Sequence, residues 1–277
     1  MDNRRLPTVL AAVVASITQR LRVGTAGVML SYHSPLKVAE DFRLLELLFP
    51  GRIDLGTIRG VEGAAPTHKA LLDGRPESAA DYESKFDLLA DLLRAGTGMP
   101  GPQCGLSVTP ATRSAPQLWA CALSERSVTM AAKRGVGLAY HRYLAHAHGK
   151  ADGSYLATLY RARFVPSFHR VEPGLVVLCI GCCAESAAQA ESIWRRARGV
   201  PPDDPVVVGG IQGGPGDRGP DFLGEPDQCV RQLQAIAEQF ATPELALNCV
   251  DESVESQARQ YERLALAAGI PNEVSFV

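Results

Sequence analysis

Two segments of the chain combine residue types that can hold an anion. Arg59 and Gly60 follow the short apolar run 52–58, and Ser124 and Ser127 stand at the start of a helical pattern. An arginine can donate two parallel hydrogen bonds to a phosphate, and the first turn of a helix offers unpaired backbone N–H groups beside the serine hydroxyls. The combination predicts a phosphate site. On local pattern alone, however, Ser124 is more often an ordinary helix N-cap, and a lone Arg59 is more often part of a surface ion pair.

Histidines give two further candidates for chemistry, because an unperturbed imidazole titrates near neutral pH. His33 follows an apolar run, and His141 comes directly after the predicted strand 135–140. Either side chain can serve as an acid or a base toward a substrate. For His33, a purely structural role as a loop histidine that is hydrogen-bonded to the backbone is equally consistent with the sequence. His141, His146 and His148 form a cluster without a carboxylate at metal-ligand spacing, so we expect no metal site.

Strand-like and helix-like segments alternate along most of the sequence, which favours a parallel sheet covered by helices. The predicted strands are 21–30, 52–58, 117–123, 135–140, 175–181, 206–208 and 245–250. The predicted helices are 7–19, 35–49, 82–93, 124–134, 155–163, 185–198, one that begins at Pro226 and one that ends at Leu264. Polar or Gly- and Pro-rich loop excursions are expected at 61–80, 96–116 and 209–225.

The composition is typical of one soluble globular domain. The chain has 277 residues, of which 46% are hydrophobic, and a single barrel needs about 250 residues. A formal net charge of -2 gives no reason to expect nucleic acid or an anionic membrane surface as a partner, and the apolar runs are too short to span a bilayer. Seven cysteines without CxxC spacing favour a cytoplasmic location, with Cys182 and Cys183 as buried packing.

A glycine-rich segment, Gly214–Gly219, formally matches the GxGxxG fingerprint of dinucleotide-binding proteins. That fingerprint needs a helix directly after it, so that the helix N-terminus meets the pyrophosphate. Here Pro220 and a polar stretch follow instead. We therefore predict a loop and no dinucleotide site.

The order of several runs resembles the bacterial luciferase-like flavin monooxygenase superfamily over most of the chain, and the combination is specific although no single run is. These runs are Thr18-Gln-Arg-Leu-Arg-Val-Gly-Thr-Ala26, His33-Ser-Pro-Leu-Lys-Val-Ala-Glu40, Pro50-Gly-Arg-Ile-Asp-Leu-Gly-x-x-Arg-Gly60, Ser124-x-x-Ser127 before Ala131-Ala132-x-x-Gly135, and Gly224-x-Pro226.

The resemblance implies a TIM (β/α)8-type barrel that binds reduced FMN at the carboxyl ends of its strands. By motif match, Arg59, Ser124 and Ser127 would hold the FMN phosphate. Two further pairs match positions beside the flavin: Gly60 with Leu123 along the ring, and Ala26-Gly27 as a cis peptide beneath it.

Apolar residues beside these positions suggest how the ring would be held. We expect the run 21–30 to be a strand buried on both faces, with Val23, Val28 and Leu30 as an apolar floor. Relatives often have a glycine or a reactive small residue where this chain has Ile58. If Ile58 faces the flavin, thiol chemistry at that position is excluded.

The resemblance also implies eight strands, and the residues before the Pro7 helix are too few for the first two. Two explanations are open: the true start of the protein lies upstream of Met1, or the barrel lacks its first two strands, with two sheet edges exposed or filled by another element or a partner chain. The acidic and histidine residues that the family carries at the end of the second strand are then absent.

The leading hypothesis is an FMN-dependent monooxygenase that uses reduced flavin and O2 on a small or medium-sized organic substrate, in specialised metabolite biosynthesis. A separate flavin reductase would supply the reduced FMN, because no NAD(P)H site is predicted. One alternative keeps the fold and uses the deazaflavin F420 for hydride transfer. The other is a non-catalytic barrel subunit that stabilises a partner chain, and a homodimer or heterodimer is expected in either case.

Overall fold

The computed structural model describes most of the chain, and every structural statement below is limited to the described residues. These are residues 7–60, 70, 72, 79–95, 97, 108–147, 153–201, 205–208 and 219–270. The glycine-rich segment 214–219 therefore lies almost wholly outside the described residues, as do most of the excursions 61–80 and 96–116.

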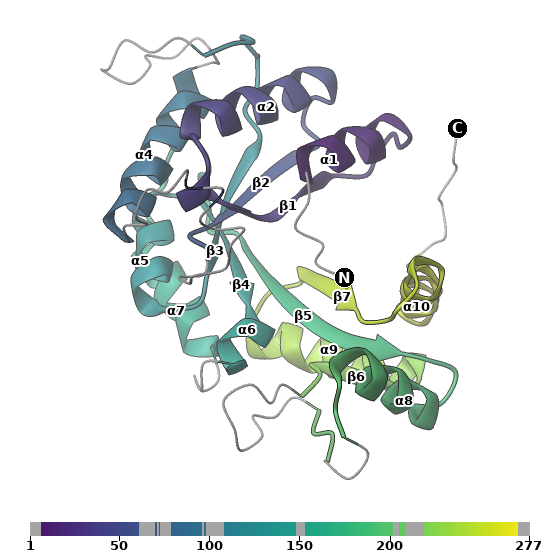
Figure 1. Cartoon of the computed structure of the whole chain (residues 1–277). Coiled ribbons are helices and arrows are strands. Elements are labelled where there is room, and N and C mark those ends of the chain that lie inside the picture. The colour runs from purple at the N-terminus through teal and green to yellow at the C-terminus, as the bar shows by residue number, and fades with distance from the viewer. Residues whose placement is uncertain are drawn as a thin grey trace.

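The strands form one parallel sheet that curls into part of a barrel (Figure 1). They are β1 Val23–Met29, β2 Ile53–Ile58, β3 Gln117–Ala122, β4 Gly137–His141, β5 Leu175–Cys183, β6 Phe222–Gly224 and β7 Leu245–Cys249. Parallel pairing runs without a break through β1, β2, β3, β4, β5 and β7, and β6 adds to the end of β5. This half-barrel confirms the prediction of a TIM-type barrel without all of its strands.

Helices cover the convex face of the sheet, and α1 and α10 flank its open side (Figure 1). They are α1 Pro7–Ser16, α2 Pro35–Leu48, α4 Ala79–Ala95, α5 Glu125–Lys133, α6 Arg142–Ala147, α7 Ser154–Arg163, α8 Ala187–Arg198, α9 Pro226–Gln239 and α10 Val254–Ala267, with the short 3-10 helix η1 Leu30–Tyr32 after β1. None of these helices is long and apolar enough to cross a membrane.

Side-chain alternation along the strands divides the interior into two parts. Leu55, Leu118 and Leu138 point to the convex face and belong to the main core with the helices. Cys121, Ala139 and Leu178 point to the other face and form a separate cluster, which we call the concave cluster. Because successive side chains of a strand point to opposite faces, the ends of the same strands can serve both a core and a site.

The prediction of a strand at 206–208 was wrong. Val206 and Val208 form no ladder and instead pack against a second core that contains Ile180 and Trp194. The strand that pairs with the end of β5 is β6, which lies inside the predicted loop excursion 209–225. A short apolar run signals burial, and burial alone does not distinguish a strand from a covering loop.

The prediction that the run 21–30 is buried on both faces was also wrong. Val23 and Val28 are buried, whereas Gly24 and Ala26 are exposed. Since β1 pairs with β2 alone among the described strands, it is an edge strand whose concave side borders a cavity. Its Val and Leu content reflects one buried face.

Close approach of β1 and β2 makes Gly56 a sensitive position. A Cβ atom on Gly56 would lie 2.1 Å from the carbonyl oxygen of Thr25, which cannot move without disturbing the strand pair. We expect Gly56→Ala to lower the free energy of unfolding by about 2–3 kcal/mol, measured by urea denaturation.

The matched control is Gly199→Ala in the turn after α8. Gly199 has a φ of 65° but nothing within 4 Å of the added Cβ, so only backbone strain of about 1 kcal/mol is expected. Equal losses in the two variants would contradict the close-approach argument.

Candidate functional site

The carboxyl ends of β2 and β3 bring the predicted anion-binding residues to one edge of the sheet. Arg59 follows β2 directly, and Ser124 is the N-cap of α5, just after β3. The two strands are parallel neighbours, with Thr57 opposite Ala120. Parallel neighbours end at the same edge, so the Arg59 backbone and the first turn of α5 lie there together.

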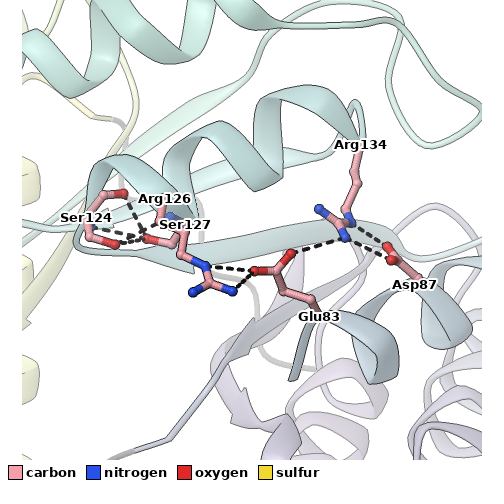
Figure 2. Close-up of polar contacts among 6 residues, drawn as sticks. All are labelled: Glu83, Asp87, Ser124, Arg126, Ser127 and Arg134. Atoms are coloured by element: carbon pink, nitrogen blue, oxygen red, sulfur yellow. Dashed lines mark hydrogen bonds and ion pairs between the residues drawn. The ribbon is translucent and has the colours of Figure 1, made fainter. Parts of the chain in front are cut away.

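The serines form a reciprocal cap at the start of α5 (Figure 2). The Ser127 amide donates to Ser124 Oγ at 3.4 Å, the Ser124 amide donates to Ser127 Oγ at 3.1 Å, and the two hydroxyl oxygens are 3.0 Å apart. The ordinary N-cap interpretation is therefore correct. This cap is compatible with anion binding. Ser124 Oγ accepts the helix amide through a lone pair, so its hydroxyl proton can still be donated to a ligand.

Ion pairs to α4 fix the position of this helix (Figure 2). Arg126 contacts Glu83 at 2.8 Å, and Arg134 contacts both Glu83, at 3.6 Å, and Asp87. The charges of Arg126 and Arg134 are thus balanced by carboxylates of α4. Each exposed pair contributes little alone, but together they hold the first turn of α5 against α4.

Tyrosines lie beneath the segment that contains Arg59 and Gly60. Tyr82 Oη is 3.4 Å from Thr57 Oγ1, and burial raises the pKa of Tyr82 although the nearby charge of Arg59 opposes this shift. Gly60 has a φ of 118°, and a Cβ there would lie 2.8 Å from the Tyr32 ring. Only glycine fits at this turn, so its backbone is open to a close approach by a ligand.

The peptide bond between Ala26 and Gly27 is cis, as the resemblance implied. A Cβ on Gly27 would lie 2.9 Å from Cys121 Sγ, which places this peptide against the concave cluster. Ala26, Ala139 and Leu178 also line a cavity of about 550 Å³ on the same face, but most of its lining stands near the amino ends of the strands and includes the charged residues Arg22, Asp54, Arg170 and Glu244. This cavity therefore lies at the opposite end of the strands from Arg59 and Ser124.

Val23, Val28 and Leu30 do not form the expected floor of this site. All three belong to the main core with the helices. The apolar surface on the concave face comes instead from Cys121 of β3, Ala139 of β4 and Leu178 of β5, with Ile58 of β2 packed against them. The sequence identified the strands, but it did not indicate which of their two faces was concave.

The concave cluster contains no reactive thiolate. Ile58 faces the cluster, so the position where relatives often have a reactive residue is aliphatic. Cys121 is the neighbouring thiol, which sequence reasoning missed, and burial raises its pKa to about 12. A thiol with that pKa stays protonated and is a poor nucleophile at neutral pH.

His141 is a buried, neutral side chain at the end of β4. Its exposure is 3%, and neither ring nitrogen has a hydrogen-bond partner among the described residues. Burial lowers its pKa to about 4. Directly after it, Arg142 forms a buried ion pair with Asp221, and Asp221 Oδ2 accepts a bond of 2.9 Å from the Ile180 amide.

His33 lies apart from His141, since it follows β1 and two strands separate β1 from β4. It is at the surface, and its amide donates to the Leu30 carbonyl at 3.2 Å. Partial burial and then the positive charge of Lys85 lower its pKa. The structure therefore does not bring the two predicted catalytic histidines together.

No group of three or more metal-ligating side chains occurs in the described part of the chain. Cys182 and Cys183 are fully buried at the end of β5, which confirms the expectation that they serve packing.

Comparison with known sequences identifies one family. The family model described as luciferase-like monooxygenase matches residues 2–243. Among curated relatives, the uncharacterized protein YceB of Bacillus subtilis is 30% identical over 276 residues, which cover 94% of this chain and 82% of YceB.

Comparison with solved structures agrees with this result. The crystal structure of apo-MsnO8 has a TM-score of 0.78 and 28% identity, and the match covers 96% of this chain and 83% of MsnO8. The oxygenating constituent of 3,6-diketocamphane monooxygenase from Pseudomonas putida, a type II Baeyer-Villiger monooxygenase in complex with FMN, has a TM-score of 0.62 at 15% identity, covering 98% of this chain and 85% of that chain. This second likeness shows the fold alone.

Because His141 is buried in its neutral form, we expect the folded state to lose stability at acidic pH. Its pKa falls from an ordinary value of about 6.5 when unfolded to about 4 in the folded chain. The folded state then binds fewer protons than the unfolded state in this window, so stability is full above pH 6.5 and is lost as the pH falls toward 4.

We expect this one group to account for up to about 3 kcal/mol of that loss. His141→Leu removes the titration, so urea denaturation between pH 7 and pH 4.5 should show a weaker pH dependence than in the unmodified protein. Parallel profiles would contradict the assignment.

Proposed function

The chain belongs to the luciferase-like monooxygenase family, and from this membership we propose an oxygenase that uses reduced FMN and O2 on a small or medium-sized organic substrate, in specialised metabolite biosynthesis. One observation supports the proposal above others: Arg59 and the first turn of α5 end neighbouring strands at one edge of the sheet, beside an apolar concave face. A phosphate and a planar apolar ring need those two surfaces side by side.

The residues present fit FMN. Arg59 and Ser124 offer a guanidinium and a hydroxyl to the phosphate, in addition to the amides of the first turn of α5. The peptide bond between Ala26 and Gly27 is flanked by a single methyl group, because glycine has no side chain. Gly60 likewise leaves its backbone uncovered at the turn. A flat ring can therefore lie against backbone and against the small side chains of the concave cluster.

The protein's contribution is position and the exclusion of water. Bound reduced flavin supplies the electrons and the reaction with oxygen. Ile58, Cys121 and Leu178 present apolar surface toward that place, and the thiol of Cys121 stays protonated. An apolar wall of this kind limits hydrolysis and proton leakage during the reaction.

The reduced flavin and the assembly state belong to the same proposal. A separate reductase supplies reduced FMN, and the protein works in the cytoplasm as a homodimer or a heterodimer. Helix α1 supports an assembly, since Val9, Leu10 and Val13 on it are each more than half exposed. Large exposed apolar side chains gathered on one helix are typical of an interface.

Reconstitution tests the cofactor. We expect the purified protein to bind FMN at micromolar levels and to show flavin absorbance after removal of unbound FMN. A single deazaflavin band after incubation with an equal mixture of FMN and F420 would favour hydride transfer instead. Absence of both cofactors would favour the non-catalytic subunit.

Arg59→Ala tests the phosphate contact. We expect FMN affinity to fall by one to two orders of magnitude, about 1.5–3 kcal/mol for a charge-assisted contact, measured by quenching of flavin fluorescence. Riboflavin, which lacks the phosphate, should bind equally well to the variant and to the unmodified protein.

The matched control is Arg231→Ala, because Arg231 is exposed on α9, far along the chain from the site. It should leave both affinities unchanged. If Arg59→Ala weakened FMN and riboflavin equally, Arg59 would not be a phosphate ligand.

Ser124→Ala separates the cap from the ligand contact. Loss of the cap should cost about 1 kcal/mol of stability, and loss of the hydroxyl donor should weaken FMN, but not riboflavin, several-fold. Ser253→Ala is the matched control, because Ser253 caps α10 by accepting from the Ser256 amide at 3.0 Å. It should lose the same stability and keep its FMN affinity; a loss of FMN affinity there would point to a general effect of destabilisation.

A further inference from the structure

The cavity at the amino ends of the strands is a second candidate site. Its volume is about 550 Å³, which is within the usual range for sites that bind small molecules. The residues that line it come from both β1 and β7, the strands on either side of the open side of the half-barrel (Figure 1). Since Arg59 and Ser124 stand at the carboxyl ends of β2 and β3, this cavity is separate from the candidate phosphate site.

A tryptophan ring is fixed in the wall of this cavity. The Trp119 Nε1–H donates to Asp54 Oδ1 at 2.9 Å, and Asp54 is also paired with Arg22 at 2.9 Å. Gly137 is the register partner of Trp119 on β4, and a Cβ there would lie 2.3 Å from the indole. The indole therefore lies against the β4 backbone, and its hydrogen bond to Asp54 fixes its orientation.

Arg170 brings a positive charge to this ring. The Arg170 Cζ lies 4.6 Å from the centroid of the Trp119 ring, and Nη1 donates to Gln117 Oε1 at 3.3 Å. Arg170 forms no ion pair with a carboxylate in the described part of the chain. A guanidinium has five N–H donors in one plane, so a stacked arginine can still donate from its edge to a carboxylate.

Glu244 brings a negative charge to the β7 side of the cavity. It stands directly before β7, beside Val176 of β5, and its carboxylate forms no ion pair within the described ranges. The hydrogen bond to Asp54 is the main reason that the pKa of Arg22 is raised, and the charge of Glu244 adds to this shift. The lining therefore has no net charge, but it contains one unpaired cation, Arg170, and one unpaired anion, Glu244.

We propose that this cavity binds a small zwitterion with an apolar body, of the class of an α-amino acid with an aromatic or aliphatic side chain. Arg170 binds the carboxylate and Glu244 binds the ammonium group. The apolar body lies on Ala139, Leu178 and Ala246, which line the same cavity. A ligand with only one of the two charges would meet a repulsive charge and leave the attractive partner of the other unused. The inference concerns a site apart from the cofactor and does not rest on the proposed function.

Three probes with the same phenylethyl body test this class. L-phenylalanine carries both charges, 3-phenylpropanoate carries only the carboxylate, and 2-phenylethylamine carries only the ammonium group. Each is titrated into protein labelled with 15N at tryptophan. The chain has two tryptophans, and Trp194 is an internal reference because it is buried in the second core. We expect L-phenylalanine to shift the Trp119 indole resonance, to leave that of Trp194 unchanged, and to bind about tenfold more tightly than the other two probes.

Arg170→Gln and Glu244→Gln test the two charges separately. Each should lower the affinity for L-phenylalanine about tenfold. Glu244→Gln should leave 3-phenylpropanoate binding as well as before or better, because a repulsive charge is removed, and Arg170→Gln should do the same for 2-phenylethylamine. Arg170→Lys is the second variant at that position, in case glutamine disturbs the Trp119 ring. It keeps the positive charge, so it should retain more affinity for L-phenylalanine than Arg170→Gln does.

The matched controls are Arg231→Gln and Glu238→Gln, which remove one charge of each sign from exposed positions on α9. Both should leave the binding of all three probes unchanged. An equal loss of affinity in a control and in the cavity variant of the same charge would point to a general effect of net charge and would overturn the assignment.

Three further results would contradict the inference. The first is a Trp119 resonance that does not respond to L-phenylalanine at millimolar concentration. The second is equal binding of the three probes, which would indicate an apolar cavity without charge selection. The third is a Trp119 shift that follows protein concentration and not the probe, because a second copy of the chain would then fill the cavity. Failure to bind FMN would leave these titrations unaffected, since they are carried out without flavin.

Discussion

Parallel pairing of β2 with β3 is the constraint on which the candidate site depends. Because parallel neighbours end at the same edge, the pairing sets Arg59 beside the first turn of α5 although 65 positions separate Arg59 from Ser124. The reciprocal cap of Ser124 and Ser127 then fixes where that helix begins. Ion pairs from Glu83 hold the helix from the other side (Figure 2).

The concave face combines low polarity with one orphaned polar group. Cys121, Ala139 and Leu178 supply apolar surface, and desolvation keeps both the Cys121 thiol and the His141 imidazole uncharged. These side chains therefore form an uncharged patch at neutral pH.

Several parts of this arrangement were readable from the sequence because local patterns encode them. Proline at a first turn and apolar spacing predicted α2 and α9, and the pattern before Gly135 predicted α5 with its serine cap. Other parts were not readable. Val206 and Val208 have strand-like composition but cover a core, and the three residues of β6 are too few to give a pattern.

The sequence by itself determined the alternation of strands and helices and the helix caps, because each depends on neighbours within a few residues. It also determined the order of the motifs that places the chain in its family, because that order is a property of the sequence alone. The tertiary structure decided which face of each strand became the concave side, and therefore that Cys121 and Leu178, not Val23 and Val28, form the apolar wall. It also decided that His141 is buried without a partner and that His33 lies at the surface. These properties depend on how the sheet curls and on what distant segments cover, which no local pattern contains.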